Sequence, residues 1–99
     1  MFGLPDKTIS MINEIFSKSP EVEKVLIYGS RARGDYRNGS DIDLTIIGDV
    51  SLKEKTRIWG QIDDLPIPYT CDLSVLGNIK NENLLEHIER VGQVFYERA

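Results

Sequence analysis

The sequence predicts an α/β (α+β) fold, with a small mixed β-sheet and helices packed on one face of it. Three observations support this prediction. Apolar residues recur at helical spacing in three segments, two other segments alternate apolar and polar residues, and one short run is apolar throughout. The resulting element order is αβ(α)βαβαβ. The 99 residues are 40% hydrophobic and 28% charged, so we expect a single domain over residues 1–99.

The first half of the chain supplies one long helix and two strands. The helix opens at Asp6 and ends before Pro20, because proline cannot continue a helix. The apolar run over residues 25–28 predicts a strand that is buried on both faces. Polar residues 30–40 predict a turn of helix followed by a loop. Residues 41–47 then alternate apolar and polar side chains, which is typical of a strand.

The second half supplies two helices and two strands. Ser51 and Glu54 have the spacing of a capping box and open the next helix. Residues 69–76 alternate like the preceding strand, with apolar side chains on one face. The last helix ends at Gly92, where a C-cap glycine is expected. Residues 94–96 predict a short closing strand.

Composition excludes several classes of function. Twelve Lys and Arg against sixteen Asp and Glu give a net charge of −4, which argues against general binding of nucleic acid or of an anionic membrane. No apolar run approaches the ~18–20 residues that cross a bilayer, and residues 1–7 lack a signal pattern, so we expect a cytoplasmic protein. Cys71 and His87 are single, which excludes a disulfide framework and a Cys/His zinc cluster. We interpret both as structural residues.

Three aspartates are the main candidates for chemistry. Asp41 and Asp43 share one face of a predicted strand, with Cα atoms about 6.6 Å apart from the strand rise. Asp72 lies on the polar face of the next alternating strand and joins them if the two strands are neighbours. Carboxylates ~5 Å apart repel by about 3 kcal/mol per pair at an effective dielectric of ~20. A hard cation such as Mg²⁺ removes that repulsion. The alternative is that each is an ordinary strand-opening or surface aspartate.

Gly29 and Ser30 follow the first strand and are candidates for phosphate binding. Glycine allows the backbone to approach a phosphate closely, and Ser30 opens the short helix that follows. A plain strand-to-helix turn is the alternative. The motif is not a Walker A loop, because Asp35 and Tyr36 occupy the positions that require Lys and Ser or Thr.

The order of these features carries a family resemblance. An apolar strand is followed by Gly29-Ser30, then ten residues, then Asp41-Ile42-Asp43-Leu44, and Asp72 lies on a later strand. This arrangement resembles the nucleotidyltransferase superfamily that includes DNA polymerase beta. Residues 29–44 in particular are similar to the minimal nucleotidyltransferases of prokaryotes. The resemblance implies the nucleotidyltransferase fold and a single minimal nucleotidyltransferase domain.

The resemblance also implies a role for each motif residue. Asp41 and Asp43 would hold two Mg²⁺ ions. Asp72 would hold the ion nearer the acceptor and help to deprotonate the acceptor hydroxyl. Gly29 and Ser30 would bind the β- and γ-phosphates of a nucleoside triphosphate. The reaction would be in-line attack on the α-phosphorus, with release of pyrophosphate.

Arginines and aromatic residues supply secondary candidates. Arg31 and Arg33 would place positive charge beside the triphosphate, and guanidinium groups match phosphate oxygens, so we expect both to bind nucleotide. A solvated loop is the alternative. Tyr28 and Trp59 have rings that can stack on a base, although core packing is the favoured interpretation of both.

The resemblance finally suggests a partner. Minimal nucleotidyltransferases are often paired with a small helical HEPN toxin, which implies transfer of AMP from ATP to a tyrosine of that toxin. Larger relatives carry a C-terminal helical domain that this chain lacks before Ala99, so we expect the acceptor site to come from another polypeptide or from a homo-oligomer. One alternative is a binding module that neutralises its partner by contact. Another is nucleotidyl transfer to a small molecule.

Overall fold

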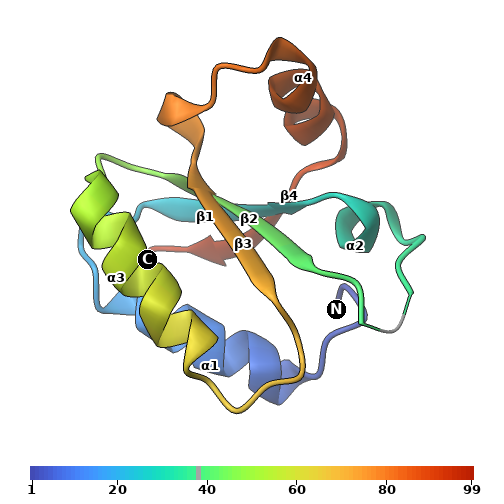
Figure 1. The fold of residues 1–99 in the computed structure, drawn as a ribbon, viewed down its shortest axis with the longest axis horizontal. Helices are drawn as coiled ribbons and strands as arrows, with labels where there is room; N and C mark the ends of the chain where they lie inside the picture. Colours follow the sequence, from blue (N-terminus) through green and yellow to red (C-terminus); the bar gives the residue numbers. More distant parts are fainter. Residues whose placement is uncertain (38) are drawn as a thin grey trace.

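The computed structural model describes residues 1–37 and 39–99. Its elements follow the predicted order, with one additional 3₁₀ turn (Figure 1). In sequence, they are α1 (Asp6–Ser17), β1 (Lys24–Tyr28), α2 (Ser30–Arg33), β2 (Ile42–Ile47), α3 (Leu52–Asp63), β3 (Cys71–Val75), η1 (Leu76–Asn78), α4 (Glu82–Val91) and β4 (Gln93–Glu97).

The four strands form one mixed sheet in the order β3-β2-β1-β4. β1 pairs antiparallel with both β2 and β4, and β2 pairs parallel with β3. The short closing strand predicted over residues 94–96 is β4, which lies at the edge of the sheet beside β1. The parallel pair matters most for function, because it places the two strands that carry the aspartates next to each other.

The main core lies between the sheet and the helices α1 and α3. Alternate residues of every strand point toward these helices, so the alternation predicted for residues 41–47 and 69–76 is confirmed. Phe16, Ile58 and Ile62 pack against them from the helices and are almost fully buried. Each fully buried aliphatic or aromatic side chain contributes roughly 1.5–3 kcal/mol to this packing.

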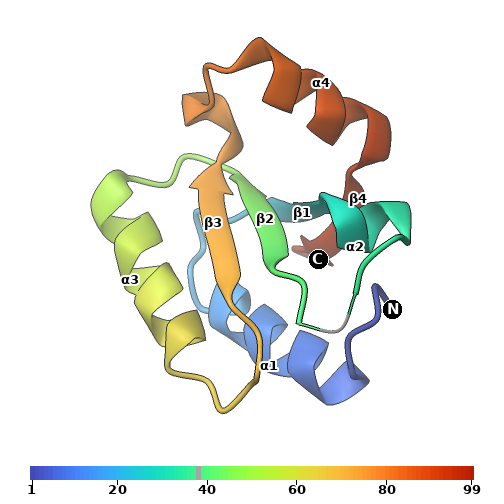
Figure 2. The same ribbon diagram turned by 45° about the vertical axis from the view of Figure 1, so that its right-hand side comes forward.

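The predicted arrangement of helices holds for α1 and α3, whereas α4 lies on the opposite side of the sheet (Figure 2). Leu26 of β1 points away from the main core and lines a small apolar cavity together with Leu85 and Ile88 of α4. This contact explains why residues 25–28 are apolar on both faces of the strand. None of the described helices has the length and apolar character needed to cross a membrane.

Two local predictions have different outcomes. The Ser51 side chain accepts a hydrogen bond from the Glu54 backbone N–H at 3.1 Å, as expected of the N-cap of α3. Gly92 does follow α4, but its backbone is extended (φ −61°) rather than left-handed. Glycine is required there because a Cβ atom would collide with the carbonyl oxygen of Ile88, to which the Gly92 N–H donates.

Candidate active site

The sheet register brings Tyr28, Asp43 and Asp72 side by side on the face that α1 and α3 leave open. Tyr28 of β1 is the partner of Asp43 of β2, and Asp43 is the partner of Asp72 of β3. Neighbouring strands lie about 4.8 Å apart, so the two carboxylates are direct neighbours. Asp72 is exposed and does not face the apolar interior. Asp41 is also exposed and lies one residue before β2.

The electrostatics of Asp43 show that the carboxylates are close enough to interact. Burial raises the pKa of Asp43, and the negative charges of Asp72 and Asp41 raise it further, whereas His87 lowers it. A half-buried carboxylate with two acidic neighbours binds a proton or another cation more readily than an isolated one. The all-oxygen set of Asp41, Asp43 and Asp72 suits Mg²⁺ in particular.

The carboxylates are not already closed around one point. Among residues 1–37 and 39–99, no group of three or more His, Cys, Asp or Glu side chains is arranged to hold a metal ion. The backbone register places Asp43 and Asp72 as neighbours, so these two carboxylates form the pair that could share a cation.

The Gly29-Ser30 turn packs directly against Asp43. Gly29 has φ +75° and ψ −155°, a conformation that favours glycine. A Cβ atom at this position would also collide with Oδ2 of Asp43. The glycine thus allows the turn to approach the carboxylate, and the structure brings together the predicted phosphate turn and the predicted metal ligand.

His87 contacts the candidate site, and sequence reasoning, which interpreted it as structural, did not find these contacts. Its Nε2 accepts a hydrogen bond from the backbone N–H of Gly29 at 3.1 Å, and its ring meets Tyr28 edge-on. The contact joins residues 58 positions apart, so no local spacing could reveal it. The one available signal was that His87 is the single histidine of the chain.

Tyr28 lies beside the two carboxylates and is buried, as the favoured core interpretation expected. Burial raises the pKa of Tyr28, a hydrogen bond with Ser74 lowers it, and Asp72 and Asp43 raise it. The net direction is upward, so the phenol keeps its proton near neutral pH and offers an O–H donor beside the carboxylates.

Arg31 is buried and hydrogen-bonded to backbone carbonyls, and its role in nucleotide binding stays a prediction. The side chain is only 3% exposed. Its guanidinium donates to the carbonyl oxygen of Ser40 at 3.1 and 2.9 Å and to that of Phe2 at 3.0 Å. The rings of Tyr36 and Tyr69 lie 5.2 and 5.0 Å from it. With its donors committed to backbone carbonyls, Arg31 is a structural residue. The guanidinium would have to break these hydrogen bonds before it could bind phosphate.

Arg33 has an exposed environment that matches the alternative of a solvated loop. Its Nε lies 3.3 Å from Oδ1 of Asp35, in an ion pair whose members are both largely exposed. Exposed pairs of this kind contribute little to stability. The side chain remains free to move toward a ligand, so its predicted role in nucleotide binding is left as a prediction.

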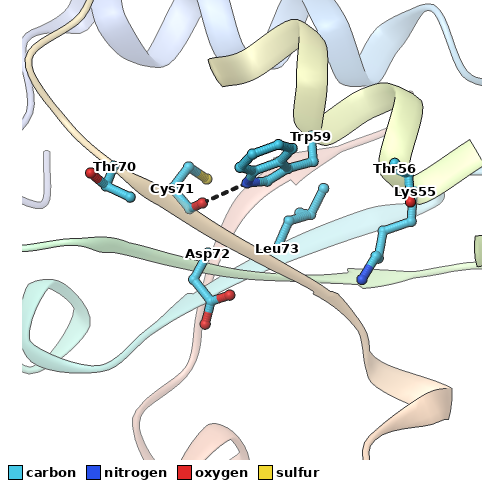
Figure 3. A pocket seen from close by; sticks show the side chains of 7 residues that line it. All are labelled: Lys55, Thr56, Trp59, Thr70, Cys71, Asp72 and Leu73. Carbon is cyan, nitrogen blue, oxygen red and sulfur yellow. Dashed lines mark hydrogen bonds between the residues drawn. The ribbon is translucent and has the colours of Figure 1, made fainter.

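A cavity of about 440 Å³ lies between α3 and the outer edge of β3 (Figure 3). Its lining residues are Lys55, Thr56, Trp59, Thr70, Cys71, Asp72 and Leu73. Trp59 is 41% exposed, so the prediction that it packs in the core is wrong. Its indole N–H donates to the carbonyl oxygen of Cys71 at 3.0 Å, which fixes the ring at the edge of the sheet.

Cys71 is buried, as predicted for a small core residue. Burial raises the pKa of the Cys71 thiol to about 12, with smaller contributions from the neighbouring aspartates. The thiol therefore stays protonated near neutral pH, and a nucleophilic role for it is disfavoured.

Comparison with known proteins identifies both a family and a fold. The model of the family described as "Polymerase beta, Nucleotidyltransferase" matches residues 10–99. A protein of Methanocaldococcus jannaschii, provisionally named a protein adenylyltransferase, is 48% identical over 42 residues. These are 41% of this chain and 42% of that protein, so the match spans less than half of either.

Solved structures match over nearly the whole chain. One is a toxin-antitoxin crystallised with AMP-PNP, with a TM-score of 0.72 and 16% identity over 96% of this chain and 75% of the other. Another is the complex of a tri-AMPylated Shewanella oneidensis HEPN toxin with its MNT antitoxin. Its TM-score is 0.68, with 14% identity over 93% of this chain and 71% of the other. A third, provisionally named a nucleotidyltransferase, comes from Sulfolobus solfataricus. Its TM-score is 0.59, with 24% identity over 93% of this chain and 79% of the other. At these identities, the similarity establishes the fold.

Proposed function

Since the chain belongs to the polymerase beta nucleotidyltransferase family and is a nucleotidyltransferase, we propose that it transfers AMP from ATP to a protein hydroxyl. The acceptor in this proposal is a tyrosine of a small helical HEPN-type toxin, and the chain acts as the antitoxin. Residues 1–99 would serve as one minimal nucleotidyltransferase domain. Two relatives support the choice, namely the provisionally named adenylyltransferase and the antitoxin bound to an AMPylated HEPN toxin.

One observation carries the proposal. Asp43 and Asp72 are register partners on the open face of the sheet, and the Gly29 turn packs against Asp43 so closely that a Cβ atom there would have to displace the carboxylate. A site for nucleotidyl transfer needs a metal-binding carboxylate pair beside a group that holds phosphate. This juxtaposition supports both requirements at one place in the fold.

Asp41, Asp43 and Asp72 would hold Mg²⁺. Their oxygens are the ligands that this ion prefers. Burial raises the pKa of Asp43, and the negative charges of Asp72 and Asp41, which a cation would neutralise, raise it further. When bound, Mg²⁺ supplies positive charge that neutralises the triphosphate and stabilises the attacking and leaving oxygens. We expect two ions, as the family resemblance implies, with Asp43 on β2 and Asp41 directly before it as their shared ligands.

The protein's own groups would bind the phosphates and accept the proton of the acceptor. The Gly29 N–H and the Ser30 hydroxyl would bind phosphate oxygens, with the Gly29 N–H exchanging its bond to His87 for one to the nucleotide. Asp72, on the exposed side of the pair, would accept the proton of the acceptor hydroxyl. The acceptor oxygen then forms a bond to the α-phosphorus as the bond to the bridging oxygen breaks, and pyrophosphate leaves. Orientation of the two reactants supplies much of the rate enhancement.

The test is to mix the purified chain with ATP, MgCl₂ and a candidate HEPN-type partner protein, and to weigh both proteins by intact-mass spectrometry. We expect one or more added AMP groups on a tyrosine of the partner. Asp43→Asn should abolish the modification. Asp49→Asn removes the same charge from an exposed loop position and should leave it unchanged.

The same experiment examines the alternative of a contact-only antitoxin. That alternative requires no metal at Asp41, Asp43 and Asp72, so Asp43→Asn should leave neutralisation intact. The binding module would be the better explanation if the mass of the partner stays unchanged while the wild type and Asp43→Asn both bind and neutralise it.

A further inference from the structure

The edge strand β3 has backbone groups beside Asp72 that pair with no other strand, and one of them, the Cys71 carbonyl, accepts from Trp59. β3 pairs only with β2 in the sheet order, so its other edge is open among the described strands. The Ile42 N–H donates to the Thr70 carbonyl, which orients Thr70 toward β2. Because backbone groups alternate along a strand, those of Cys71 and Leu73 point away from β2. The bond from the Trp59 indole to the Cys71 carbonyl confirms this orientation.

A groove with two walls lies beside this edge of β3. Lys55 and Trp59 are one helical turn apart on α3 and form one wall, and β3 forms the other. Its volume of about 440 Å³ lies within the usual range for ligand sites. Trp59 presents an exposed ring that is held in place, and such aromatic residues often dominate binding energy at interfaces.

The two faces of β3 differ in chemistry. Figure 3 shows the Asp72 side chain on the opposite side of the strand from Trp59 and the Cys71 thiol. A nucleotide base on Trp59 would therefore be separated from the carboxylates by the strand itself. An extended peptide has no such difficulty, because its successive side chains point to opposite faces of the sheet. One residue can reach Trp59 while its neighbour reaches the side of Asp72.

We propose that the free edge of β3 binds an extended segment of the acceptor protein by strand addition, with the acceptor hydroxyl on the Asp72 side and a neighbouring apolar residue on Trp59. This inference rests on the proposed function, since it names how that same site takes its protein substrate. Lys55 has no ion-pair partner among the described residues, so an acidic residue of the segment complements the groove. Strand addition supplies affinity through backbone hydrogen bonds and specificity through alternate side chains.

Kinetics with the acceptor protein test the proposal. Truncation of an aromatic interface residue commonly costs a factor of ~10 in affinity, so Trp59→Ala should raise the KM for the acceptor about tenfold and leave the KM for MgATP unchanged. Lys55→Glu should also raise the acceptor KM alone. Leu52→Ala is the control, because Leu52 is 69% exposed on the same helix and does not line the groove. An increase confined to the KM for MgATP would show that the groove holds the base and overturn the proposal.

A binding measurement keeps the inference separate from the enzymatic function. Trp59 is the only tryptophan, so 5-fluorotryptophan labelling gives one ¹⁹F resonance that reports on the groove. The acceptor protein should shift this resonance, and the Leu73 amide should gain protection from hydrogen exchange. MgATP alone should do neither. Failure of the proposed function would appear as these binding signals without AMP transfer, whereas AMP transfer without either signal would refute strand addition.

Discussion

Replacing Asp43 by Asn should stabilise the folded chain while abolishing its activity. The half-buried carboxylate of Asp43 faces Asp72 across one strand spacing, so the folded state holds two like charges about 5 Å apart. Coulomb's law gives about 3 kcal/mol for such a pair at an effective dielectric of ~20 and about 0.8 kcal/mol in water. Because Asp72 is exposed, we expect about 1–2 kcal/mol. For a chain of this size, that raises the melting temperature by at least ~4 °C.

The pH dependence of this gain has a defined sign. Asp43 has a folded-state pKa above its ordinary value of 3.8, so the folded chain holds more protons than the unfolded chain just above that value. The stability of the wild type therefore decreases as pH rises from 3.8 through the raised pKa of Asp43. Asparagine does not titrate, so the variant lacks this decrease. The advantage of Asp43→Asn should be fully present at pH 7 and absent below about pH 3.8.

Thermal unfolding monitored by circular dichroism in EDTA at low salt measures the effect at pH 7 and pH 3.5. Asp49→Asn is the control for a change in net charge, and it should give no comparable gain. Added MgCl₂ should stabilise the wild type and not Asp43→Asn, because only the wild type retains the carboxylate pair. A variant that is no more stable than the wild type at pH 7 in EDTA would refute the electrostatic argument, whatever its activity.

Four further substitutions test other parts of the structure. Ser51→Ala should lose the N-cap of α3 and about 1 kcal/mol of unfolding free energy in urea, with AMP transfer unchanged in rate. Gly29→Ala should abolish transfer and lower stability by about 1–3 kcal/mol, because alanine is strained at φ +75° and its Cβ meets Asp43; full activity would contradict the proposed turn. Arg31→Ala should lower the free energy of unfolding by about 3 kcal/mol, because it removes charge-assisted hydrogen bonds. Arg33→Ala removes only an exposed ion pair and should change the urea midpoint little. Equal losses of stability in the two variants would contradict the assignment of Arg31 as structural.

The sequence predicted the faces of the strands well because alternation is a local property. Asp43 and Asp72 were each assigned correctly to a polar face, since their apolar neighbours are buried against α1 and α3. Whether the two strands are neighbours is not contained in either pattern. That depends on the parallel pairing of β2 with β3, which the intervening helix α3 makes possible.

Trp59 and His87 make contacts that depend on distant segments of the chain. Trp59 occupies an apolar position of its helix, but it lies beside the open edge of β3 and uses its indole N–H there. His87 meets Gly29 only because α4 crosses to the opposite face of the sheet. No propensity or spacing specifies which face a helix covers when a strand is apolar on both sides.

Arg31 links the two halves of the candidate site through the backbone. It follows Ser30 directly, and its guanidinium holds the carbonyl oxygen of Ser40, the residue before Asp41. The same group binds the Phe2 carbonyl, which ties the N-terminal segment to this loop. One buried side chain thus closes the polar segment that separates the phosphate turn from the first aspartate. A charged residue next to a predicted phosphate turn can therefore set the geometry of the turn, because a buried cation satisfied by carbonyl oxygens is costly to uncover and holds its partners firmly.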